Sequence, residues 1–73
     1  MSWNYRIVEY ADGQGFGIHE VYYNNFDDPV RMTKNPAAFT GDTVEEVREA
    51  LLMARMCSIK RPIFKEPKEW THD

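Results

Sequence analysis

The sequence has little cysteine and histidine and no long hydrophobic run. Its 73 residues include one cysteine, Cys57, and two histidines, His19 and His72. A single thiol excludes an intramolecular disulfide and argues against a thiol-rich metal site. No stretch approaches the roughly 18 apolar residues of a membrane span, and the first residues lack the apolar segment of a signal peptide. We therefore expect a cytoplasmic protein without membrane contact, metal or cofactor.

Acidic charge is in slight excess and is unevenly distributed. The formal net charge is −3, and residues 1–50 carry nine acidic side chains against four basic ones. Residues 51–73 carry five basic and three acidic side chains. An acidic body disfavours nonspecific binding to nucleic acid. We expect no direct contact with nucleic acid and a protein partner with a basic surface.

Two segments alternate as strands do. Aromatic and β-branched side chains recur at every second position in residues 3–10 and again in residues 16–23, which predicts a β-hairpin. Asp12-Gly13 lies between them and favours a tight turn. Residues 30–33 favour a short third strand that ends at Asn35-Pro36. The sequence leaves open whether residues 62–65 form a last short strand.

One helix begins after residue 42. Thr43 and Glu46 have the spacing of a capping box, in which each side chain satisfies a backbone N–H group of the first turn. Arg61-Pro62 closes this region. Apolar residues at helical spacing predict the face that packs on the sheet: Val44, Val47, Leu51 and Ala54.

These elements predict an α+β domain over residues 1–65, in the order β-β-β-α-(β). We expect an antiparallel sheet of three strands, or four if 62–65 pairs, with the helix packed on one face. Residues 66–73 are expected to form a loosely ordered tail with Trp70 as its only anchor.

Apolar side chains point to both faces of the predicted hairpin, and one helix can cover only one of them. One face would carry Trp3, Tyr5, Ile7, Phe16, Ile18 and Tyr22, and the other Val8, Tyr10, Val21 and Tyr23. The helix also carries Leu52, Met53 and Met56 outside its predicted stripe. Tyrosine and methionine tolerate partial exposure, so this excess can be incidental. The alternative is a second buried surface formed with a partner or another copy.

Catalytic motifs are weak. The glycines at 13, 15 and 17 lack the spacing and the following helix of a dinucleotide-binding loop. His19-Glu20 begins like a zinc-protease motif, but Tyr23 stands where the second histidine belongs. In a strand, His19 and Glu20 point to opposite faces, which disfavours an acid–base pair. We therefore expect no catalytic residue.

Carboxylates gather around the predicted start of the helix. A well-capped, solvated helix face explains them, and so does a surface that imitates DNA phosphates and occupies a basic groove. The surface that imitates DNA would consist of Asp27, Asp28, Asp42, Glu45, Glu46 and Glu49.

Two resemblances follow from these motifs. Residues 3–7 (WNYRI), 18–23 (IHEVYY) and 41–46 (GDTVEE) resemble a family of short bacterial and phage proteins, which implies this layout and no particular activity. The helix region and the β-β-β-α-β order are also similar to the HicB-type antitoxin domain, which implies toxin binding. HicB-type antitoxins usually add a DNA-binding domain, and we expect none after residue 65.

The sequence thus favours a small, non-enzymatic acidic binding protein, similar to anti-CRISPR inhibitors, that occupies a basic surface of a nucleic-acid-handling complex. The acidic residues above would supply charge. Apolar contacts would come from Tyr10, Val21, Tyr23 and Met53. The alternative is a HicB-like or housekeeping interaction domain that self-associates through its sheet, as a homodimer.

Overall fold

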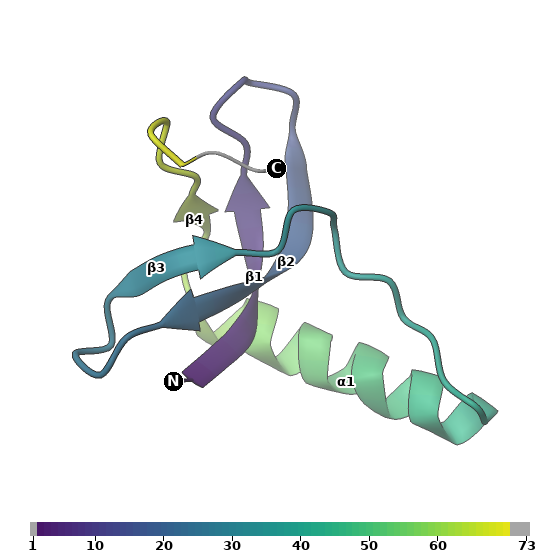
Figure 1. Ribbon diagram of the computed structural model, residues 1–73. Coiled ribbons are helices and arrows are strands. Elements are labelled where there is room, and N and C mark those ends of the chain that lie inside the picture. The colour runs from purple at the N-terminus through teal and green to yellow at the C-terminus, as the bar shows by residue number, and fades with distance from the viewer. Residues whose placement is uncertain (1, 71–73) are drawn as a thin grey trace.

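Four strands and one helix form the α+β domain that the sequence predicts. The computed structural model describes residues 2–70, and its sheet has the strand order β3-β2-β1-β4 (Figure 1). The elements are β1 (Ser2–Glu9), β2 (Phe16–Tyr23), β3 (Pro29–Met32), α1 (Val44–Lys60) and β4 (Phe64–Lys65).

The sheet is mixed because its last strand returns after the helix. β1 and β2 form the predicted antiparallel hairpin, with Ser2 opposite Tyr23 and Glu9 opposite Phe16. β3 pairs antiparallel with β2, with an irregularity in register at the end of β2. β4 pairs parallel with β1, Val8 lying opposite Phe64, since the chain crosses through α1 before it rejoins the sheet. The fourth strand therefore forms, but it is not antiparallel.

The hairpin loop is longer than a two-residue turn. Tyr10 N–H donates to the carbonyl of Gly15 at 3.0 Å, which closes the loop. Only Gly13 and Gly15 have positive φ there, at 78° and 103°. Asp12 instead accepts a hydrogen bond from the N–H of Gln14 at 2.9 Å. The Asp-Gly pair marks the turn, but only its glycine needs the left-handed conformation.

The core lies on the sheet face that carries Val21 and Tyr23, two of the residues that we expected to contact a partner. Val8, Val21, Tyr23 and Met32 are buried there. The sheet is strongly curled, with β3 turned across β1 and β2 (Figure 1). Tyr10, Phe64 and Trp70 pack against the same cluster from the hairpin loop, β4 and the carboxyl-terminal segment. The sheet and its flanking segments thus close over this face without the helix.

α1 begins as its capping box predicts. The Thr43 hydroxyl accepts from the N–H of Glu46 at 3.2 Å, and the Glu46 carboxylate accepts from the N–H of Asp42 at 3.0 Å. These bonds satisfy N–H groups that the first helical turn leaves without partners.

The buried side of α1 is narrower than predicted. α1 packs mainly against β1. Ala54, which is 2% exposed, is its one fully buried residue, and Val47 and Ala50 are half-buried. Val44 and Leu51, which we expected in the packed stripe, are 64% and 49% exposed. Because α1 crosses a single strand, only a short part of the helix is covered by the sheet. The other positions of the predicted stripe therefore remain exposed to solvent.

Residues 66–70 contact the domain rather than forming the loose segment we expected. The N–H of Glu66 donates to the carbonyl of Glu9 at 3.0 Å, and its carboxylate accepts from the N–H of Ala11 at 3.0 Å. Trp70 anchors the segment with its ring 5.5 Å from that of Phe64. The rest of the expected tail, residues 71–73 with His72, lies outside the described residues. Within residues 2–70, no helix has the length and apolarity needed to cross a membrane.

Candidate protein-binding surface

The outer side of α1 carries exposed apolar side chains among its charged ones. Successive helical residues are turned by about 100°, so positions 52, 56 and 59 share the side opposite Ala54. Neighbouring leucine and methionine side chains widen this surface. The exposed members, between 44% and 68% accessible, are Leu51, Leu52, Met53, Met56 and Ile59.

A groove of about 690 Å³ runs along one flank of this surface. Its far wall is formed by Asn4 of β1 and by Arg61 and Pro62, which follow the helix. Its helical wall consists of Glu49, Leu52, Met53, Met56, Cys57 and Lys60. We call this feature the α1 groove.

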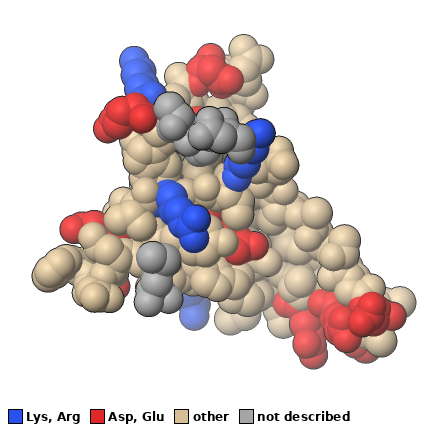
Figure 2. Space-filling view, viewed as in Figure 1, with Lys and Arg blue, Asp and Glu red and all other residues tan. Residues whose placement is uncertain are grey.

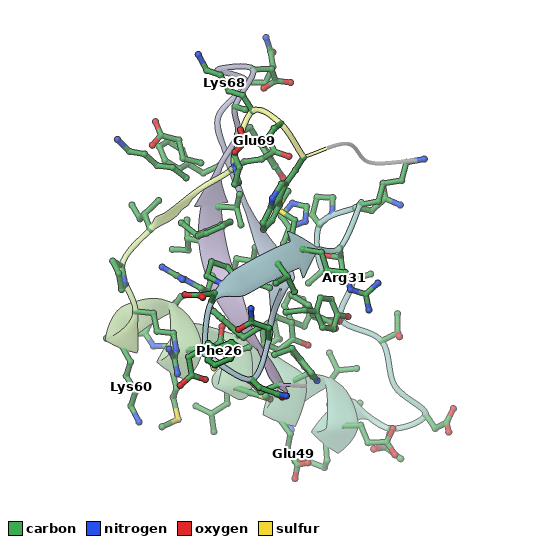
Figure 3. All side chains as sticks on the ribbon, turned by 60° about the vertical axis from the view of Figure 1, so that its left-hand side comes forward. Phe26, Arg31, Glu49, Lys60, Lys68 and Glu69 are labelled. Atoms are coloured by element: carbon green, nitrogen blue, oxygen red, sulfur yellow. The ribbon has the colours of Figure 1, made fainter. Side chains whose placement is uncertain are left out.

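Opposite charges stand at the two ends of the α1 groove. Glu49 lies at one end, and Lys60 and Arg61 lie at the other. Lys60 follows Glu49 by eleven positions in the helix, a rise of about 16 Å along the axis. Figure 3 shows both side chains projecting from α1 on the side away from the sheet. The groove is thus an apolar channel with an acidic end and a basic end.

The basic end is held in place by a polar network. The amide oxygen of Asn4, when it is turned towards the end of the helix, accepts a hydrogen bond from Arg61 Nε at 2.8 Å. In this orientation the amide nitrogen of Asn4 donates to the Tyr23 hydroxyl at 2.9 Å. Arg6 also donates to the Tyr23 hydroxyl, at 3.3 Å, and to the carbonyl of Pro62, at 2.7 Å. These bonds fix the chain that follows α1 against β1.

The six predicted acidic residues do not form one patch. Figure 2 shows acidic side chains gathered where α1 begins, with others scattered over the molecule. Asp27 instead lies near Arg61, beside the opposite end of the helix. A helix of 17 residues is about 25 Å long, so Asp27 and its neighbour Asp28 are far from the gathered carboxylates. That group consists of Asp42, Glu45, Glu46 and Glu49.

Two of the gathered carboxylates already have partners in the fold. Glu46 belongs to the capping box, and Glu45 forms an exposed ion pair with Arg48 at 2.9 Å. The first turn of α1 therefore explains part of the acidic cluster by itself, because carboxylates stabilise the positive end of the helix dipole.

Of the four predicted apolar contacts, the structure leaves one clearly accessible. Val21 is fully buried and Tyr23 is 7% exposed, so the prediction that they contact a partner is wrong for the folded chain. Tyr10 is half-buried, and its hydroxyl is directed at His19. Met53 is exposed and lines the α1 groove. The curl of the sheet is the cause, since it turns the face that carries Val21 and Tyr23 into the core.

His19 is a structural residue of that core. Its side chain is 1% exposed. Nδ1 lies 2.9 Å from the carbonyl of Thr33, a group that only accepts, so Nδ1 carries the proton. In the neutral imidazole, Nε2 then accepts from the Tyr10 hydroxyl at 2.8 Å. Both ring nitrogens are thus engaged, and within residues 2–70 no three His, Cys, Asp or Glu side chains lie together as metal ligands would.

The other face of the sheet carries aromatic side chains in contact. The Trp3 ring meets the Tyr5 ring edge-on at 5.2 Å. Burial, followed by the charges of Glu20 and Cys57, raises the pKa of Tyr5. A 2.7 Å hydrogen bond to Glu20 is the main cause of a raised pKa at Tyr22. These phenols stay protonated at neutral pH and serve packing.

The sequence predicts Glu49 and Met53 as partner contacts and Leu52 and Met56 as additional apolar surface, which are four of the nine residues that line the α1 groove. Glu49, Met53 and their apolar neighbours follow from helical spacing, and the same spacing also places Lys60 on that side. Asn4 and Pro62 carry no such signal, because only the crossing of α1 over β1 brings them to the helix.

Comparison with protein-family models, curated proteins and solved structures finds no match to this chain.

Proposed function

We propose that this chain is a non-enzymatic protein-binding module and that the α1 groove is its contact surface. The observation that supports this most is the set of exposed apolar side chains on the outer side of α1. A surface helix of a self-sufficient domain normally presents polar side chains to water. Here the apolar side chains of Leu52 and Met56 are 58% and 47% exposed to solvent.

The chemistry of the groove suits a protein segment better than a small polar molecule. Methionine side chains are flexible and polarizable and adapt to apolar partners. Met53 and Met56 lie in its helical wall, between the charged residues at the two ends. Recognition of an amphipathic helix by an apolar groove uses this arrangement, with charge fixing the direction of the bound segment.

Site-specific cross-linking tests the proposal. A photoreactive amino acid replaces Met56 in one tagged variant and Lys68 in another, since Lys68 lies far from α1 (Figure 3). We expect the residue at position 56 to cross-link to a protein partner, and this adduct to be lost when Met53→Glu is introduced into the same chain. The residue at position 68 should give no adduct. Equal adducts from both positions, or none from position 56, would contradict the proposal.

A second candidate function rests on the acidic start of α1. We propose that a module of this kind inhibits a nucleic-acid-handling complex, as anti-CRISPR proteins do, by placing this end of the helix on a basic surface. Glu45 and Glu49 are the carboxylates to test, because reversing Glu46 would also break the capping box. Binding that weakens steeply between low and high salt, and on Glu45→Lys with Glu49→Lys, supports this function. Binding indifferent to both changes would refute it.

A further inference from the structure

We propose that the occupant of the α1 groove is a second copy of this chain, whose α1 lies antiparallel to the first across a two-fold axis. This inference rests on the proposed function and names the partner. It differs from self-association through the sheet, one face of which is already the core.

The groove residues of α1 are spaced symmetrically along the helix. When two copies of a helix lie antiparallel, one residue of the first copy lies beside one residue of the second, at the same height along the common axis. The two residue numbers of every such pair add up to the same value. The helical wall contains three such pairs, all centred between residues 54 and 55: 49 with 60, 52 with 57, and 53 with 56. A two-fold axis at that point therefore makes the wall its own counterpart, as an isologous dimer requires.

The charges at the ends of the groove are complementary under the same symmetry. Glu49 of each copy lies at the level of Lys60 in the other, and Arg61 follows one residue later. Each acid–base pair occurs twice because of the two-fold axis. A parallel arrangement would instead place like charges together, so charge selects the antiparallel one.

The middle of the interface is apolar. Met53 of each copy faces Met56 of the other, and Leu52 lies at the level of the half-buried Cys57. Pairing two copies covers side chains that each monomer leaves in water. It also adds a second apolar cluster to a domain whose own core of buried hydrophobic residues is small.

Charge reversal and its compensation test this arrangement. The wild-type chain, Glu49→Lys, Lys60→Glu and the double variant are examined by sedimentation velocity at low salt over a range of concentrations. We expect a wild-type dimer, and a dimer Kd at least about 10-fold weaker in each single variant, because two contacts per dimer become repulsive. The double variant restores opposite charges and should regain the dimer. An equimolar mixture of the two single variants should form a heterodimer for the same reason.

Matched controls carry the same charge changes far from α1. Glu69→Lys and Lys68→Glu lie at the other end of the molecule (Figure 3) and should leave the dimer unchanged. Circular dichroism verifies that each variant is folded.

A monomeric wild-type chain, or a dimer unaffected by both single reversals, would overturn the inference. If the chain is monomeric but position 56 still cross-links to another protein, the binding function stands and only the second copy is refuted. Absence of both dimer and adduct refutes the two together.

Discussion

Replacing Tyr10 by phenylalanine tests the buried hydrogen bonds that hold the hairpin together. The Tyr10 hydroxyl donates to His19 Nε2 at 2.8 Å, and the imidazole is 1% exposed. Tyr10→Phe keeps the ring, which packs edge-on against His19 at 5.5 Å, and removes only the donor. A buried acceptor left without a partner costs about 1–3 kcal/mol. Small domains have a total stability of roughly 0.05–0.15 kcal/mol per residue, so this is a large fraction.

The measurement is urea unfolding followed by tryptophan fluorescence, at one protein concentration. We expect a lower midpoint with an unchanged slope, and a Tm lower by roughly 5–20 °C. Tyr22→Phe is the matched control: it also loses a hydroxyl bonded to a side chain, but its acceptor Glu20 is half-buried and can bind water. That variant should lose about 0.5 kcal/mol. Equal losses in the two variants would show that burial of His19 does not set the cost.

Three further outcomes follow from single contacts. Gly17→Ala should destabilise the domain by about 1–3 kcal/mol in urea unfolding, because a methyl group there would collide with the Tyr10 hydroxyl, with the ring carbon Cζ 3.0 Å away. Thr43→Ala should cost about 1 kcal/mol and reduce helical circular dichroism, since the helix loses its cap. Glu20→Gln should lower the pKa of Tyr22 in a phenolate absorbance titration, because the carboxylate that stabilises the protonated phenol loses its charge. The raised pKa also means that the stabilisation from Tyr22 is complete below the ordinary tyrosine pKa and is lost as the pH rises through the folded-state value.

Local patterns predicted the elements because each depends on neighbours in sequence. The alternation in residues 16–23 matches β2 residue for residue, and the capping box at Thr43 marks the start of α1. The short strands were harder to predict. β4 has two residues, too few for a period, and its parallel pairing depends on where the helix delivers the chain.

The choice of core face could not be made from the hairpin alone. Both faces alternate correctly, so the pattern is equally satisfied by burying Val8 and Val21 or by burying Tyr5 and Ile18. Met32 of β3 and Phe64 of β4 decide between them, because both pack against Val8 and Val21. These contacts are long-range, and the sequence pattern contains no information about how far the sheet curls.

The same geometry explains why the helix surface is the part that we propose for binding. A helix that packs on a sheet needs apolar side chains only on its packed side, so its outer side is free to be polar. Here the sheet and its flanking segments close over Val8 and Val21, and α1 is held mainly through β1 and the close approach that Ala54 permits. Little of the helix is needed for the core, yet Leu52 and Met56 remain apolar. Charged residues at those positions would not disturb the packing of α1 on β1. We therefore expect that their apolar character serves the contacts with a second chain proposed above.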